Sequence, residues 1–391
     1  MSIFNNLKVA FKDKTNFELN RSLLIFSIIS NPIISKSLIT LTKILINLRI
    51  PIDFFIKHTI FKQFCGGTNI KNTSAIIDKL WKSKIGSILD YSVEGKEKDI
   101  DFEKVKNETI NNIIKASKSK KIPFAVFKAT GLTKFNLLKK INSNKNLKKE
   151  EIIEKEKFIN RIETICKTSY NYKTPVFIDA EESWIQEGID KIVLLMMKKY
   201  NKKEVYIYNT LQMYRIDRLN YLNEILSIAK KEKFLLGIKL DRGAYHQQEI
   251  DRAIKLKYDV PVFITKNQTD ESFNSSLKLC CDNINYISIC AGTHNEYSSQ
   301  LLIDLMKKNN INKNDSRIYF SQLLGMSDHI SYNISEHGFN TAKYVPYGPI
   351  KEVIPYLIRR AEENTSISGQ MNRDLLNILN EKKRRKFNLN N

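Results

Sequence analysis

Eight short segments rich in Ile, Val, Phe and Tyr recur along the chain from about residue 85, and a stretch with helical spacing follows each. They lie at residues 85–92, 122–130, 174–181, 205–212, 234–245, 284–295, 316–326 and 341–348. Nearly continuous apolar strands that alternate with helices are typical of parallel βα units. Eight such units in one chain of this length predict an α/β fold of the (β/α)8 barrel type.

Helical patterns fill the connections between these segments. Residues 148–170, 182–200 and 216–230 each place apolar side chains at helical spacing on one face. The run PVFITK at residues 261–266 also has the composition of a strand. Because a ninth strand would break the closure of the barrel, we assign this run to the long connection after the fifth strand.

The first 80 residues have a different pattern from the rest of the chain. Their apolar stretches are interrupted by Pro32 and Pro51, which predicts several helices that begin or end at these prolines. We expect residues 1–80 to form a helical region that packs on or near the barrel. The barrel is expected at residues 85–370, and a C-terminal helix with a basic tail at residues 371–391.

The N-terminal apolar segment does not predict a spanning helix. Residues 22–35 are uncharged, but Pro32 interrupts them and Lys36 follows, whereas a transmembrane helix needs ~20 mostly apolar residues. Charged residues upstream of the segment argue against a signal peptide. Apolar stripes with lysine flanks also suit a peripheral contact with the inner face of a membrane. The five cysteines lack CxxC or metal-ligand spacing, as in reduced cytoplasmic proteins.

The strong positive charge raises the question of a nucleic-acid partner. The chain has 64 Lys and Arg against 42 Asp and Glu, a net charge of +22. A clustered basic face is typical of nucleic-acid binding, but these lysines are spread along the whole chain, and KKRRK at residues 382–386 is one of few clusters. We expect no nucleic-acid partner, and keep a basic RNA- or DNA-binding protein as the alternative from a different class.

Polar residues stand where the predicted strands end. In a (β/α)8 barrel the active site lies at the carboxyl ends of the strands. Each polar residue alone has an ordinary explanation as a loop residue or a helix cap, but together they predict a ligand-binding mouth. A Schiff-base lysine, as in an aldolase, is an alternative use of such a site. The residues are Glu94, Lys128, Asp179, Gln212, Arg242, Thr293, His294, Asn295, Gln322 and Tyr344.

A dense motif follows the last predicted strand. The segment GPIKEVIPYLIRRAEENTS at residues 348–366 has helical spacing of its apolar residues, and Pro349 stands where a helix would begin. Arg359 and Arg360 are adjacent, so the two side chains would flank a cavity. Paired guanidinium groups offer planar donors that suit a carboxylate or a phosphate.

Several of these segments resemble the proline dehydrogenase family. They are IDAEESW, FLLGIKLDRGAY, AGTHN, QLLGM and KYVPYGPIKEVIPYLIRRAEENTS, and the likeness covers about residues 85–366. The resemblance implies a distorted barrel that holds FAD, oxidises L-proline to Δ1-pyrroline-5-carboxylate and passes electrons to a membrane quinone. We expect a monofunctional enzyme, because the chain has no room for the aldehyde dehydrogenase domain of bifunctional relatives.

The resemblance also implies which residues contact the substrate. Cationic positions would bind the proline carboxylate, and Asp179 would be the acidic residue near Lys128. Three further side chains would wall the proline ring, and a first-strand glutamate would pair with Arg359. The cationic positions are Arg359, Arg360 and Lys128. The side chains around the ring would be Tyr245, Leu323 and Tyr344, and the first-strand glutamate is Glu94.

A second set of positions matches the flavin contacts of the family. Gln212 and Lys239 align with residues that hydrogen-bond the isoalloxazine ring, although some members carry Arg in place of Lys239. No GxGxxG motif follows a strand, so FAD would sit on the barrel mouth and not in a doubly wound fold. The remaining aligned positions are Arg242, Gly243, Ala244, Thr265, Lys266, Thr293, His294, Asn295, Gln322 and Glu363.

The chemistry that the resemblance implies is hydride transfer from C5 of proline to flavin N5. It requires no metal and no side-chain nucleophile, and we interpret His294 as a cofactor contact in preference to a base. The protein would supply position and a water-poor pocket. Hydroxyproline dehydrogenase remains open as an alternative, because that choice depends on one wall of the pocket.

Overall fold

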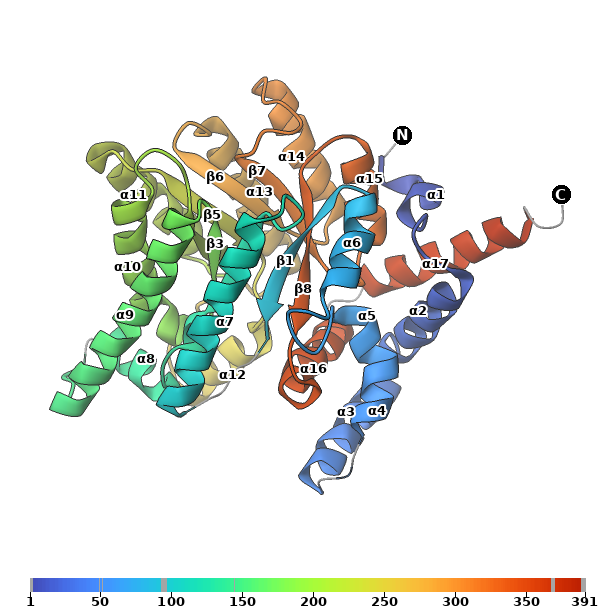
Figure 1. Ribbon diagram of the computed structural model, residues 1–391, viewed down its shortest axis with the longest axis horizontal. Helices are drawn as coiled ribbons and strands as arrows, with labels where there is room; N and C mark the ends of the chain where they lie inside the picture. The colour runs from blue at the N-terminus through green and yellow to red at the C-terminus, as the bar shows by residue number, and fades with distance from the viewer. Residues whose placement is uncertain are drawn as a thin grey trace.

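The computed structural model describes residues 3–48, 50, 52–92, 97–143, 145–366 and 370–387. Eight parallel strands form one closed barrel in sequence order, with the last strand paired to the first (Figure 1). The predicted (β/α)8 fold is therefore confirmed, and each strand lies inside its predicted segment. The strands are β1 Ile85–Tyr91, β2 Phe124–Lys128, β3 Val176–Asp179, β4 Ile207–Gln212, β5 Leu236–Asp241, β6 Ile287–Gly292, β7 Ile318–Leu323 and β8 Thr341–Tyr347.

Helices follow the strands and cover the outside of the barrel. Leu, Ile, Val and Met side chains fill the space between these helices and the sheet. The PVFITK run lies in the connection after β5, where Val262 makes an isolated antiparallel bridge with Arg215 outside the barrel. The helices are α7 Asp99–Ser117, α8 Phe135–Asn142, α9 Lys149–Asn171, α10 Ser183–Tyr200, α11 Arg218–Glu232, α12 His246–Leu256, α13 Lys266–Asp282, α14 Glu296–Lys308, α15 Asp328–Glu336 and α16 Ile350–Ser366, with the short 3-10 turn η3 Ala129–Gly131 after β2.

The N-terminal residues form a series of helices beside the barrel, and Pro32 begins α3 as the sequence predicts; Pro51 lies outside the described residues. Among the described residues no single helix is long and apolar enough to cross a membrane. The pair α2 with Pro32–Thr42 reaches the required hydropathy only together, with a 94° bend between them. The elements are η1 Ile3–Asn5, α1 Leu7–Ala10, α2 Asn16–Ile29, α3 Pro32–Asn47, α4 Asp53–Ile56, the π-helical turn η2 Lys57–Phe61, α5 Lys62–Phe64 and α6 Ser74–Lys82.

The C-terminal helix α17, Gln370–Phe387, packs against α2 and α1 (Figure 1). Arg385 donates to the backbone oxygens of Phe11 and Lys14, and both Arg384 and Arg385 pair with Glu381. The KKRRK cluster is thus not a purely solvated tail, because Arg385 holds α17 on the N-terminal region.

The inside of the barrel is packed with aromatic and aliphatic side chains. Phe124 and Phe177 stack with ring centroids 4.3 Å apart, and the ring of Tyr208 meets both at its edge. These rings belong to an apolar interior cluster that also includes Ile88, Val126, Cys290, Ala342 and Tyr344.

A buried ion network attaches the N-terminal region to the barrel. Lys343 of β8 is fully buried and its Nζ lies 2.7 Å from the carboxylate of Asp328, which also contacts Lys14 at 2.7 Å. Burial alone would raise the pKa of Asp328, but the two lysines hold it well below its ordinary value. In addition, Gln63 donates to the backbone oxygen of Gly325, in the loop after β7. Lys14 and Gln63 therefore attach the N-terminal region to the barrel and to the loop after β7.

Gly325 offers a test of this attachment. It has φ +78°, and an added Cβ would lie 2.2 Å from the backbone oxygen of Gln63. We expect Gly325→Ala to lower the free energy of unfolding by more than ~2 kcal/mol, because an overlap with backbone adds to the cost of about 1 kcal/mol for a left-handed alanine. The matched control is Gly338→Ala, with φ +85° and open space around the new methyl group. If urea denaturation showed that the two variants lose the same free energy of unfolding, the contact with Gln63 would be unimportant.

Candidate active site

A cavity of about 380 Å³ opens at the carboxyl end of the strands, where the sequence predicts the ligand-binding mouth. Its walls come from the ends of β1 to β8, from the loops that follow them, and from α16. Helix α16 lies over this end of the barrel, because Tyr356, Arg359 and Arg360 line the cavity while other residues of α16 pack on the N-terminal helices. The volume is in the range of small-molecule and cofactor sites.

Most of the sequence-predicted site residues line this one cavity. On the substrate side they are Lys128, Asp179, Tyr245, Leu323, Tyr344, Arg359 and Arg360, and on the cofactor side they are Gln212, Lys239, Arg242, Gly243, Ala244, Lys266, Thr293, His294, Asn295 and Gln322. Predicted residues from seven of the eight βα units, the second to the eighth, thus meet at one place. Their individual roles stay predictions.

Three predicted residues are not among the described residues that line the cavity. Thr265 is the N-cap of α13, where its side chain accepts a hydrogen bond from the backbone N–H of Gln268, and it is not among the described residues that line the cavity. Glu94 lies outside the described residues, and the side chain of Glu363 also lies outside them. The predicted pairing of Glu94 with Arg359 is therefore not part of the structure described.

The sequence interpretation missed several residues of the cavity wall. Tyr356 stands one helical turn before Arg359 and Arg360, so the i, i+3 and i, i+4 spacing of α16 would have identified it. Asp90 and Asp241 lie close to the carboxyl ends of two predicted strand segments, so their position alone would have identified them as candidates for the cavity wall. The complete set of missed residues is Asp90, Ala180, Asp241, Gly292, Ser321, Met326 and Tyr356.

A buried ion pair lies at the floor of the cavity. The Lys239 ammonium is 2.6 Å from the Asp179 carboxylate and donates to the Tyr344 hydroxyl at 2.9 Å. Burial alone would lower the pKa of Lys239, but the charges of Asp179 and Asp241 raise it. Lys239 therefore stays protonated. Asp179 and Tyr344 are joined by a further hydrogen bond of 3.2 Å, which fixes the ring of Tyr344 in the wall.

Lys128 has a different carboxylate close by. Its Nζ lies 3.9 Å from Glu181 and 3.4 Å from the Tyr245 hydroxyl, which in turn donates to Glu181. The sequence interpretation made Asp179 the acidic residue near Lys128. Asp179 and Lys128 stand opposite each other in the β2–β3 register. Among the described residues, Asp179 is hydrogen-bonded to Lys239 and Tyr344, and Glu181 contacts Lys128 and Tyr245.

Arg242 is fixed on the other side of the cavity. Its guanidinium lies 2.7 Å from the Asp270 carboxylate, donates to Ser298 and Thr293, and lies over the ring of Phe273. The next residue, Gly243, has φ +107°, and a Cβ there would approach the Tyr214 ring to 2.5 Å. Only glycine lets the chain turn at this point and expose its backbone to the cavity.

The lining of the cavity is cationic. Among the described residues, six basic side chains line it against three carboxylates. The basic residues are Lys128, Lys239, Arg242, Lys266, Arg359 and Arg360, and the acidic residues are Asp90, Asp179 and Asp241. Such an excess of positive charge suits a ligand with several negative groups.

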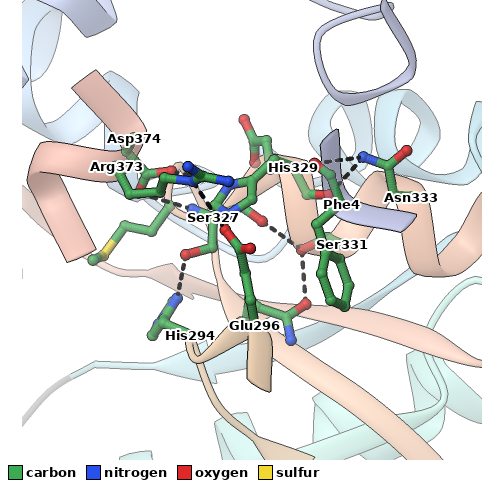
Figure 2. Close-up of polar contacts among 12 residues, drawn as sticks. Phe4, His294, Glu296, Ser327, His329, Ser331, Asn333, Arg373 and Asp374 are labelled. Atoms are coloured by element: carbon green, nitrogen blue, oxygen red, sulfur yellow. Dashed lines mark hydrogen bonds and ion pairs between the residues drawn. The ribbon is translucent and has the colours of Figure 1, made fainter. Parts of the chain in front are cut away.

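His294 lines the cavity and connects it to a polar network behind the wall (Figure 2). Its Nδ1 lies 2.9 Å from the Ser327 hydroxyl, and the backbone N–H of Ser327 donates to Asp374 of α17. Burial lowers the pKa of His294 to about 3, and Lys343 and Arg360 add to the effect. His294 is therefore neutral at physiological pH, which agrees with a binding role better than with that of a proton carrier.

His329 is the charged member of the same network. Its Nε2 lies 3.0 Å from Glu296, and its Nδ1 lies 3.4 Å from Asp374. Burial opposes protonation, but Asp374 and Glu296 outweigh it and raise the pKa of His329 to about 9. Arg373 also contacts Glu296, and Figure 2 shows these side chains converging from α14, α15 and α17. The network thereby ties the C-terminal helix to the loops that shape the cavity.

A closed barrel with one cation-rich cavity at the carboxyl ends of its strands defines a (β/α)8-barrel enzyme. A sequence model of the family described as "Proline dehydrogenase" matches residues 73–373. The chain belongs to the proline dehydrogenase family, a family of oxidoreductases.

Two relatives and one solved structure show the extent of the likeness. The chain is 32% identical over 381 residues to "Proline dehydrogenase 1, mitochondrial" of Dictyostelium discoideum, which covers 86% of this chain and 67% of that protein. It is 26% identical over 416 residues to "Hydroxyproline dehydrogenase" of Xenopus laevis, which covers 97% of this chain and 89% of that protein. The crystal structure of proline utilization A from Bdellovibrio bacteriovorus aligns with a TM-score of 0.71 at 20% identity, covering 80% of this chain and 33% of that chain, and shows the shared fold.

The elevated pKa of His329 predicts a pH-dependent contribution to stability. A histidine whose pKa rises from 6.5 to about 9 on folding stabilises the native state fully below pH 6.5 and loses this contribution as the pH rises toward 9. We expect His329→Gln to lower the free energy of unfolding by on the order of 3 kcal/mol at pH 6. The loss should be clearly smaller at pH 9.5, as measured by urea denaturation of mutant and wild type at both values. The exposed His337 supplies the control, His337→Gln. A loss for His329→Gln that does not change with pH would contradict the account.

Proposed function

We propose that the chain binds FAD in the cavity, oxidises L-proline to Δ1-pyrroline-5-carboxylate and transfers the electrons to a quinone. The observation that carries the proposal is the excess of cations among the described residues that line the cavity, which include the adjacent Arg359 and Arg360. Membership in the proline dehydrogenase family supports the substrate class.

The donor set of the cavity fits FAD. The cofactor carries a diphosphate and a ring system with several hydrogen-bond acceptors, and the wall supplies the guanidinium of Arg242, the ammonium of Lys266 and polar side chains from the loop after β6. Lys266 is the first residue of α13, so the helix terminus adds backbone N–H donors for an anion. When bound, FAD would supply the oxidising chemistry, as the acceptor of a hydride from C5 of proline.

The protein's own contribution to the reaction is position and charge. Arg359, Arg360 and Lys128 would hold the proline carboxylate, because bidentate guanidinium contacts fix both its place and its orientation. Tyr344 and Leu323 would wall the ring and exclude water. The Lys239–Asp179 pair would fix the Tyr344 hydroxyl during turnover, since both charged groups contact it.

Hydroxyproline is the second candidate substrate, and it rests on the likeness to the Xenopus laevis hydroxyproline dehydrogenase along nearly the whole chain. Discrimination would depend on whether the ring wall offers a partner for the additional hydroxyl group. Leu323 and Met326 give part of that wall an apolar character, which favours proline. Comparing kcat/KM for the two amino acids distinguishes the candidates.

Removal of one arginine tests the carboxylate contact. We expect Arg360→Met to raise the KM for proline by about 10- to 100-fold, since a hydrogen bond to a charged group contributes about 1.5–3 kcal/mol. The flavin content should remain that of the wild type. The control is Arg317→Met, at the amino end of β7, where Arg317 pairs with Asp315. An unchanged KM in Arg360→Met would contradict the assignment.

The electron acceptor is tested with the purified protein. With proline as the electron donor, we expect reduction of a soluble quinone or of dichlorophenolindophenol, followed by absorbance, and formation of the pyrroline product, trapped with o-aminobenzaldehyde. Added NAD+ should not be reduced, because we expect one redox step only. Stoichiometric NADH formation would contradict the proposal of a monofunctional enzyme.

A further inference from the structure

A closed circuit of polar contacts joins the loop after β6 to the C-terminal helix α17 (Figure 2). The Nδ1 atom of His294 lies 2.9 Å from the Ser327 hydroxyl, and the backbone N–H of Ser327 donates to Asp374 at 3.1 Å. The Asp374 carboxylate lies 3.4 Å from Nδ1 of His329, whose Nε2 lies 3.0 Å from the carboxylate of Glu296. Because Glu296 stands two residues after His294, the circuit begins and ends at the same loop.

Burial fixes the geometry of this circuit. Ser327 and His329 are fully buried, and Asp374 is 5% exposed. A buried backbone N–H without an acceptor costs free energy, so Ser327 needs the Asp374 carboxylate where it stands. Ser327 also has φ +49°, a left-handed conformation that residues other than glycine keep only when the surrounding contacts hold them in it.

The circuit reaches the cavity through His294, which lines it. Because the Ser327 hydroxyl contacts Nδ1, Nε2 is the ring nitrogen that is left for a ligand. Burial lowers the pKa of His294 to about 3, so the ring is neutral. A neutral ring that accepts from Ser327 at Nδ1 carries its proton on Nε2. In this state His294 can donate one hydrogen bond into the cavity, which suits a phosphate or carbonyl oxygen of a cofactor.

Asp374 acts on this arrangement from outside the part of the chain that matches the family model, which ends at residue 373. Helix α17 packs against α1, α2 and α15, and these contacts give Asp374 a fixed place behind the cavity wall. We propose that Asp374 is a positioning residue for cofactor binding, which orients the imidazole of His294 through Ser327. The inference rests on the proposed function, since the ligand that it concerns is FAD.

The expected effect of this positioning is on affinity. An imidazole that Ser327 already holds loses little freedom when a ligand binds, whereas a released ring has to be ordered by the binding itself. Substitution of Asp374 should therefore weaken the binding of FAD, although Asp374 is not among the described residues that line the cavity.

The test is titration of the full chain, freed of flavin, with FAD, followed by flavin fluorescence. We expect Asp374→Ala to raise the Kd for FAD by about 3- to 10-fold, which corresponds to the ordering of one side chain on binding. Asp374→Asn should bind FAD nearly as tightly as the wild type, because its amide oxygen can still accept from the Ser327 N–H. The matched control is Glu381→Ala, which removes another buried carboxylate of α17, paired with Arg384 and Arg385, and should leave the Kd unchanged.

A double variant shows whether Asp374 acts through His294. We expect His294→Ala to raise the Kd for FAD by about 10- to 100-fold, the size of a lost hydrogen bond to a charged group. In that background Asp374→Ala should have no further effect, since the ring that it orients is absent. Ser327→Gly removes the hydroxyl but keeps the backbone N–H and tolerates a positive φ. It should raise the Kd as Asp374→Ala does, and it serves as the test if Asp374→Ala does not fold.

Three results would overturn the inference. The first is a Kd for Asp374→Ala and Ser327→Gly equal to that of the wild type. The second is an equal loss of affinity in Glu381→Ala, and the third is an additive loss in the double variant, because both would show a general loosening of the fold in place of positioning. A wild type that fails to bind FAD at all would contradict the proposed function itself, which separates that failure from the other three.

Discussion

The pairing of β8 with β1 is the constraint on which the rest of the structure depends. Seven register pairs, from Ile85↔Thr341 to Tyr91↔Tyr347, close the sheet. Because side chains alternate along a strand, closure directs Tyr344 to the interior ion pair and Lys343 to Asp328 on the outside. The same strand therefore serves the cavity and the attachment of the N-terminal region.

The electrostatic organisation follows from this geometry. Cations converge at the carboxyl ends of the strands, and the carboxylates that would neutralise them are fewer. Behind the wall, further charges are paired and buried: Lys343 with Asp328, and His329 with Glu296 and Asp374. These pairs join the N-terminal helices and α17 to the loops after β6 and β7, so segments distant in sequence hold the cavity wall in place. The net charge of +22 is thus mostly unrelated to the site.

Sequence patterns predicted the barrel and most of the cavity for a physical reason. Parallel strands bring their carboxyl ends together, so a polar residue at a strand end, such as Gln212 or Lys128, is placed by the fold alone. Contacts between charged groups were harder to predict, because Asp179 stands beside two lysines and the direction of its side chain decides which one it joins. The contact of Arg385 with the N-terminal region was not predicted, since nothing in its local sequence indicates that α17 packs on α2. The His329–Asp374 contact was missed for the same reason.

The measurement that tests the account most directly is the absorption spectrum of the purified protein before and after anaerobic addition of proline. The account predicts the two absorption bands of an oxidised flavin, one in the near ultraviolet and one in the blue, and it predicts that proline bleaches the band at longer wavelength. Arg360→Met should need a much higher proline concentration for the same bleach. A protein that holds no flavin after reconstitution with FAD, or a flavin band that proline leaves unchanged, would contradict the central claim.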